Sequence, residues 1–317
     1  MDRRDFIQTS LTASAGAAFG WNFEERVLLA QAEGRKPAPA PASPPAASAM
    51  PTGKLGDLTV SRLICGGNLI SGIAHSRDLV YVSPLVAKYN TTEKILETLE
   101  LAEKCGINTV FLRDTQQSVN IMSKYWRERG GGMQWIAQAE DSEDGIYVGI
   151  RRSIDGGAAG VCIQGEAADQ FVLNGQFDLL AEAYGDIERA GVLAGIGAHR
   201  LEVLLACREH GLKPQFFLKT FNSKSYWSAG PKPRNDSVWE ETPKETAEFM
   251  ASSEAPWVAF KVLGAGAIMP QEGFQYAFSG GADFIVVGMF DFQIEEDVRI
   301  AKQVLSGDLK RTRSWKT

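Results

Sequence analysis

Two lysines stand at the ends of successive apolar runs that are typical of buried strands. Lys219 follows Phe216-Phe217-Leu218, and Lys261 follows Val258-Ala259-Phe260. Two ammonium groups packed together in a dry site repel each other, so one of them loses its proton near neutral pH. A neutral amine can attack a carbonyl carbon and form a Schiff base. Lys219 and Lys261 are therefore candidates for binding or activating a carbonyl group; the alternative is that each pairs with a nearby carboxylate.

Other polar groups follow further strand-like runs. Glu166 and His199 are the candidates for proton transfer, because carboxylates and imidazoles are the usual general acids and bases. The residues expected to orient substrate oxygens are Asn68, Arg113, Gln138, Gln164, Asn222 and Asp291. The glycines expected to hold an anion through backbone N–H groups are Gly264, Gly266 and Gly288, although tight turns need glycine too. No HxxxH or HxE spacing occurs among the three histidines, so no metal site is predicted.

Eight short apolar runs alternate with amphipathic segments from Gly53 onward. The runs show the continuous hydrophobicity of buried parallel strands rather than the alternation of a half-exposed sheet. They are Arg62–Gly66, Thr109–Leu112, Gln134–Gln138, Gly160–Ile163, Val192–Ile196, Gln215–Leu218, Trp257–Val262 and Phe284–Val287. Eight such units in one domain of residues 53–317 predict an α/β fold, a (β/α)₈ TIM barrel, over a doubly wound sheet. In a barrel, the carboxyl ends of the strands form one mouth, where all the polar residues above would converge.

The beginning of this domain resembles the aldo-keto reductases. The resemblance rests on Lys54-Leu55-Gly56, on Val60-Ser61-Arg62-Leu63 and on the small-residue loop from Cys65 to Gly72. Further along, residues 102–109 and 195–199 are similar to the family's passage into its second strand and to its fifth strand and loop. The resemblance implies a barrel scaffold and NADP-dependent carbonyl reduction.

The sequence departs from this family at its catalytic tetrad of Asp, Tyr, Lys and His. Arg113-Asp114-Thr115-Gln116 follows the second strand without the family's aspartate-to-tyrosine pattern. Gln138 and Gln164 stand where the resemblance implies a Lys and a His, and glutamine carries no charge. The scaffold is therefore expected without the usual reductase chemistry, and the cofactor is left undefined, with NADP as one possibility. Lys219 and Lys261 are locally similar to the two lysines of deoxyribose-phosphate aldolase, whose Schiff-base lysine ends strand six.

The first fifty residues look like an export leader followed by a linker. Arg3-Arg4, Phe6 and a mild apolar stretch resemble a twin-arginine signal over residues 1–32. Residues 33–52 are rich in Pro and Ala, which is typical of an extended linker. We expect the export machinery to recognise the precursor and the product to be periplasmic or secreted. The sequence contains no apolar run of about 18 residues, which is the length that a helix needs to cross a membrane, so no membrane span is predicted.

Composition and charge narrow the classes of partner. The net charge is −6, which argues against nucleic-acid binding because a phosphate-binding surface needs a basic stripe. The sequence thus predicts an exported barrel enzyme that acts on a small polar carbonyl compound or sugar derivative by acid–base or Schiff-base chemistry, as a lyase, isomerase or hydrolase. Two alternatives stay open: an NADP-dependent oxidoreductase with a rearranged site, and a non-catalytic sugar-binding barrel.

Overall fold

The computed structural model describes residues 49–75, 79–143, 145–223 and 239–316. The chain divides into two compact units, Met1–Ser48 and Ala49–Thr317, and the described residues all belong to the second. The expected signal of residues 1–32 and most of the expected linker therefore lie outside the described residues. Among the helices that the structure does describe, none is long and apolar enough to cross a membrane.

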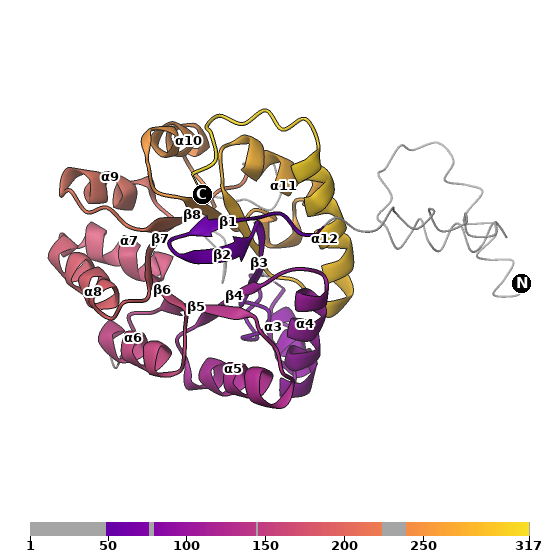
Figure 1. Cartoon of the computed structure of the whole chain (residues 1–317). Coiled ribbons are helices and arrows are strands. Elements are labelled where there is room, and N and C mark those ends of the chain that lie inside the picture. Colours follow the sequence, from indigo (N-terminus) through magenta and orange to yellow (C-terminus); the bar gives the residue numbers. More distant parts are fainter. Residues whose placement is uncertain (1–48, 76–78, 144, 224–238, 317) are drawn as a thin grey trace, which may run out of the picture. The chain divides into compact units, whose positions relative to one another are not determined.

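Eight parallel strands close into a barrel, which confirms the predicted (β/α)₈ fold (Figure 1). The order around the barrel is β10-β3-β4-β5-β6-β7-β8-β9. These strands are β3 (Leu63–Gly66), β4 (Thr109–Arg113), β5 (Gln134–Ala139), β6 (Gly160–Ile163), β7 (Leu193–Ala198), β8 (Phe216–Thr220), β9 (Trp257–Phe260) and β10 (Phe284–Val287). Each of the eight predicted apolar runs corresponds to one of them.

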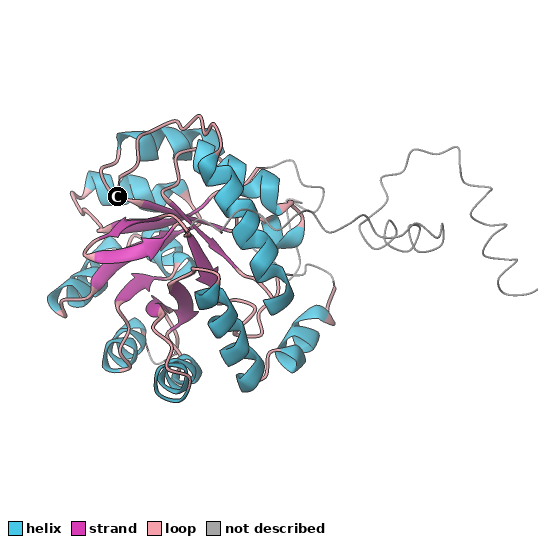
Figure 2. Cartoon of the chain, turned by 45° about the vertical axis from the view of Figure 1, so that its right-hand side comes forward, coloured by secondary structure: helices cyan, strands magenta, loops and turns pink. Residues whose placement is uncertain are grey.

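Helices surround the barrel on its outer side (Figure 2). They are α3 (Val82–Tyr89), α4 (Thr92–Lys104), α5 (Gln116–Glu128), α6 (Ile146–Asp155), α7 (Gly165–Leu173), α8 (Phe177–Arg189), α9 (Leu201–Glu209), α10 (Pro243–Ser252), α11 (Pro270–Ser279) and α12 (Asp291–Ser306), with a short 3₁₀ turn, η1 (Gly264–Gly266). The connections after β3 and β6 each contain two helices, and α3 is the additional helix of the first.

The register of the strands separates an inner and an outer face of the barrel wall. Cross-strand partners such as Phe111 and Ile136, or Leu218 and Val258, belong to the inner hydrophobic cluster. The intervening residues, such as Trp135 and Ala259, pack in the outer cluster beneath the helices. Both faces are apolar because barrel strands are buried on both sides.

A β-hairpin covers the amino-terminal ends of the strands. It consists of β1 (Thr52–Leu55) and β2 (Leu58–Ser61), and it lies across the barrel in Figure 1. Leu55 and Val60 join the inner cluster. The Thr59 carbonyl accepts hydrogen bonds from Asn108 and Gln134, which stand at the starts of β4 and β5. This end of the barrel is therefore closed, and the carboxyl ends of the strands form the mouth.

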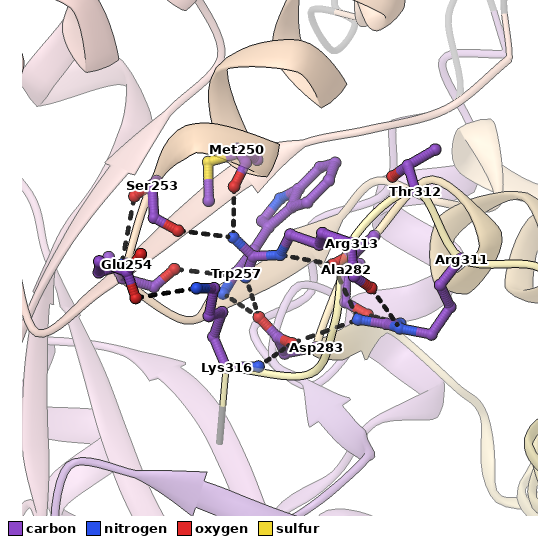
Figure 3. A network of polar contacts seen from close by, with 12 residues as sticks. Met250, Ser253, Glu254, Trp257, Ala282, Asp283, Arg311, Thr312, Arg313 and Lys316 are labelled. Atoms are coloured by element: carbon purple, nitrogen blue, oxygen red, sulfur yellow. Dashed lines mark hydrogen bonds and ion pairs between the residues drawn. The ribbon is translucent and has the colours of Figure 1, made fainter.

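The C-terminal segment after α12 binds at the same closed end (Figure 3). Asp283, which precedes β10 and is completely buried, pairs with Arg313 and lies 3.3 Å from Arg311 Nη2. Its carboxylate also accepts the backbone N–H groups of Trp257 and Lys316, at 2.9 and 3.0 Å. One carboxylate thus joins the starts of β9 and β10 to the end of the described chain.

Candidate functional site

His199 is the best-defined chemical group at the mouth. It follows β7, is 9% exposed, and its Nδ1 lies 2.9 Å from Oδ2 of Asp169 on α7. The other oxygen of Asp169, Oδ1, accepts the backbone N–H groups of His199 and Arg200 at 3.2 and 3.1 Å. Because Asp169 accepts from Nδ1, the neutral imidazole carries its proton there and presents the lone pair of Nε2.

The imidazole of His199 extends from α7 toward β9. Its ring centroid lies 5.4 Å from that of Phe260, a side chain of the inner cluster. Nε2 is on the opposite side of the ring from Nδ1, so it points away from Asp169. Burial lowers the pKa of His199, the positive charge of Lys261 lowers it further, and Asp169 opposes both effects. The neutral form, with Nε2 able to accept a proton, is therefore favoured at neutral pH.

Lys261 has an unusual backbone conformation at the end of β9. Its φ is +58°, in the left-handed region that side chains with a Cβ rarely adopt. Asn222 Nδ2 donates a hydrogen bond to the Lys261 carbonyl at 3.0 Å, and Asn222 is itself buried. Strained conformations of this kind persist only where the surroundings hold them, and they gather at functional sites. Lys261 is close enough to His199 and His75 for its charge to lower the pKa of both.

Relieving this strain should increase stability. We expect Lys261→Gly to raise the free energy of unfolding by about 0.5–1 kcal/mol, because glycine tolerates a positive φ although it costs more entropy to order. Ala265 has a φ of +56°, so Ala265→Gly is the matched control at a position away from the two histidines. Urea unfolding measures both variants. A loss of stability in Lys261→Gly alongside a gain in Ala265→Gly would contradict strain at Lys261.

The loop after β3 contributes a second imidazole. His75 Nε2 and Asn68 Nδ2 are 3.2 Å apart, so the Asn68 amide can donate to His75. Burial lowers the pKa of His75 to about 4, with smaller contributions from Lys261 and His199. The sequence placed Asn68 among the substrate-orienting residues, and the structure places it beside His75.

The lowered pKa of His75 predicts a loss of stability in acid. The unfolded chain takes up the proton at the ordinary pKa of 6.5, whereas the folded chain takes it up only near 4. The free energy of unfolding therefore falls as the pH drops from 6.5 toward 4, by roughly 2–3 kcal/mol at pH 4.5 from this residue.

Comparison with His75→Gln isolates that contribution. The variant should lose less stability between pH 7 and 4.5 in urea unfolding. Asp114, whose pKa burial raises to about 6, acts in the opposite direction but is present in both proteins. Equal losses in the two proteins would contradict the assignment.

Arg113 and Gln138 are register partners on the neighbouring strands β4 and β5. They lie on the inner face of the barrel wall, so both side chains point into the barrel. Arg113 forms a two-pronged ion pair with Glu140, with Nε 2.6 Å from Oε1. In the strand order, β4 and β5 lie opposite β8 and β9. The mouth therefore has an ion pair and an amide on one side and Lys261 on the other.

The structure corrects the expected placement of Lys219. Its register partners are Ala198 and Ala259, both of the outer cluster, so Lys219 points away from the barrel interior. The side chain is completely buried and forms an ion pair with Glu240. Burial lowers the pKa of Lys219, and the charge of Glu240 opposes this effect. Lys219 and Lys261 therefore do not face each other across a shared pocket.

Glu166 and Gln164 also differ from expectation. Glu166 is exposed at the start of α7. The Gln164 side-chain oxygen accepts the backbone N–H groups of Glu166 and Ala167, so it caps this helix. Of the four expected catalytic residues, Lys261 lies near His199 at the mouth, whereas Lys219 meets His199 only at its backbone carbonyl.

The backbone N–H groups that were expected to bind an anion after β9 form hydrogen bonds within the turn itself. The N–H groups of Gly264 and Gly266 donate to the carbonyls of Lys261 and Leu263, at 3.0 Å each. They are not available to an anion. Gly288 is exposed beyond β10. Asp291 accepts from Tyr89 at 2.6 Å and pairs with Lys94 at 3.2 Å, so it joins α12 to α3 and α4.

Comparisons with known proteins agree with the fold. Neither a protein-family model nor a curated protein sequence matches this chain. Two structures from Pseudomonas aeruginosa that are named as candidate aldo-keto reductases are similar at a TM-score of 0.56, with 18% and 16% identity. The first match covers 80% of this chain and 96% of the other, and the second covers 81% and 94%.

A phospho-2-dehydro-3-deoxyheptonate aldolase from Thermotoga maritima is similar at a TM-score of 0.51 and 12% identity, over 81% of this chain and 73% of the other. Similarity at this level of identity defines the class as a TIM barrel, the scaffold of many enzymes with different chemistry. The site must therefore be interpreted from its own residues.

Proposed function

We propose that this chain is a barrel enzyme that moves a proton on a small polar hydroxycarbonyl compound, as an isomerase or lyase, with His199 as the base. The contact between Asp169 and Nδ1 of His199 carries the proposal. A buried carboxylate on one nitrogen fixes the tautomer and directs the lone pair of the other nitrogen to the ligand. The buried imidazole is neutral at physiological pH, as a general base must be.

The proposed step begins with a C–H bond next to the substrate carbonyl. Nε2 of His199 accepts the proton while the electron pair of that bond forms an enolate, whose oxygen takes the negative charge. The ammonium of Lys261 contributes positive charge to this side of the mouth, which stabilises the enolate. Return of the proton to the former carbonyl carbon, together with transfer of the hydroxyl proton from one oxygen of the enediolate to the other, completes an isomerisation, and no oxidant or reductant is consumed. The amides of Asn68 and Gln138 would bind substrate hydroxyl groups.

Three observations weigh against Schiff-base and nicotinamide chemistry. Lys219, the better candidate for a Schiff base by analogy with the aldolases, is buried on the outer face in an ion pair. The resemblance to aldo-keto reductases implies a tyrosine and a lysine as the proton-donating pair, and the corresponding positions offer Asp114 without that tyrosine and Gln138. The N–H groups of Gly264 and Gly266 donate within their own turn and do not fit a cofactor phosphate.

The test is deuterium incorporation in D₂O, followed by proton NMR over a panel of hydroxyaldehydes, hydroxyketones and sugar acids. We expect enzyme-dependent exchange of the proton next to the carbonyl in at least one compound class. Tight NADPH binding with hydride transfer would replace the proposal by the oxidoreductase alternative. Saturable binding of a compound without proton exchange would replace it by the non-catalytic alternative.

We also propose that the chain is exported by the twin-arginine route. The Arg3-Arg4 pair, the following Phe6 and the weakly apolar stretch support this. The substrate would then be a compound of the periplasm or the medium. Retention of an Arg3→Lys/Arg4→Lys precursor in the cytoplasm, with export of the unaltered precursor, is the expected result.

A further inference from the structure

A buried ion pair lies behind the mouth, on the outer side of the barrel wall. Lys219 and Glu240 are 0% and 1% exposed. The outer face of the strands is otherwise packed with apolar side chains, among them the two register partners of Lys219. Burying two charges carries a large desolvation penalty, and a hydrophobic pair of similar volume often serves stability as well or better. Stability alone therefore does not account for this pair.

One branch of the hydrogen bonds from this pair leads to His199. Lys219 Nζ donates to the His199 carbonyl at 2.8 Å and to the Thr220 carbonyl at 3.2 Å, in addition to Glu240. An ammonium has three donors, and these three acceptors use all of them. Lys219 thus ties the backbone of His199, which follows β7, to the end of β8.

A second branch leads to Lys261. The backbone N–H of Glu240 donates to Asn222 Oδ1 at 3.3 Å, and Asn222 Nδ2 donates to the Lys261 carbonyl at 3.0 Å. This is the residue with the left-handed backbone. The carboxylate of Glu240 also accepts from Thr242 N at 2.9 Å, at the start of α10, which anchors the pair to the helix layer.

We propose that Lys219 and Glu240 are positioning residues that hold His199 and Lys261 in their mutual arrangement at the mouth. The inference rests on the proposed function, in which those two residues meet the substrate. The side chain of Lys219 lies on the outer side of the barrel wall and meets His199 at its backbone carbonyl. Lys219 acts through the carbonyl of His199, and Glu240 reaches the carbonyl of Lys261 through its backbone N–H and the side chain of Asn222.

The test compares the tautomer of His199 in folded full-length variants. The principal variant is Lys219→Met/Glu240→Leu, which replaces the pair by apolar side chains and leaves no lone buried charge. Glu240→Gln is the milder variant, because it keeps the shape and the acceptor oxygen. Nitrogen-15 NMR of the three histidines distinguishes an Nδ1-protonated imidazole from a mixture of tautomers, and His210, stacked on Phe177, is the internal reference.

We expect the double variant to remain folded and to lose the single Nδ1-protonated state of His199, with the signal of His210 unchanged. Tyr125→Phe is the matched control, since it removes another part-buried contact, to Glu103, on the helices that flank β4, which lies opposite β8 in the strand order. This control should keep the native tautomer.

A double variant that keeps the native tautomer would overturn the positioning role, whatever its effect on stability. If the double variant does not fold, Glu240→Gln decides in the same way, because loss of the carboxylate charge favours a neutral Lys219 and weakens its hydrogen bond to the His199 carbonyl. The measurement needs no substrate, so its failure is distinguishable from failure of the exchange assay.

Discussion

Replacing Asp169 by asparagine should slow proton exchange by about 10²–10⁴-fold, the usual range for a general base. The side-chain oxygen of the new asparagine can still accept the N–H groups of His199 and Arg200, which Asp169 Oδ1 accepts now. Its amide nitrogen, however, replaces the oxygen that faces Nδ1 of His199. An N–H donor at that place favours the tautomer protonated on Nε2, so the atom that must accept the substrate proton becomes a donor.

The measurement is the exchange rate in D₂O for whichever compound the unaltered protein turns over. Gln170→Ala, an exposed neighbour on α7, is the control and should leave the rate unchanged. Nitrogen-15 NMR of His199 supplies a readout independent of turnover. An Asp169→Asn variant with a native exchange rate would remove His199 as the base.

The fold was predictable from the sequence because buried parallel strands have a simple signature. Runs such as Gly160–Ile163 and Phe284–Val287 are short and wholly apolar, and amphipathic helices separate them. Eight such units permit few closed arrangements. The expected strands therefore all appear, with ends that differ by a residue or two.

The same signature does not show which residues face the mouth. In a half-exposed sheet, alternation identifies the two faces, but a barrel wall is apolar on both. Lys219 and Lys261 look equivalent in sequence, yet the register puts Lys219 between the inward-facing Leu218 and Thr220. Only the pairing of strands distant in sequence reveals that Lys219 lies on the outer face.

Asp169 was not predicted as a site residue because it lies within a helix rather than at a strand end. A signal was nevertheless present: it stands beside Ala167 and Ala168 and before Phe171, on a helix whose apolar residues must pack inward. A carboxylate on such a face is seldom buried without a partner. Glu240 gave no comparable signal, because it precedes α10 and its partner is distant in sequence.

Neutralising Asp283 should have the largest effect on stability. We expect Asp283→Asn to lower the free energy of unfolding by about 3–5 kcal/mol, since it leaves buried guanidinium groups without a compensating charge. Arg311 and Arg313 are 8% and 3% exposed, and both are paired with this one carboxylate. Urea unfolding of the full-length chain is the measurement.

The neighbouring ion pair of Lys316 and Glu254 provides the control, because Glu254 is 90% exposed. Glu254→Gln should leave the unfolding midpoint unchanged, since exposed pairs contribute little. The two variants should differ in stability because water replaces the lost partner of Lys316 but does not reach the guanidinium of Arg313. An Asp283→Asn variant as stable as Glu254→Gln would show that the C-terminal segment is held by its backbone contacts and the Arg62 and Arg311 stacks on Trp315, rather than by charge.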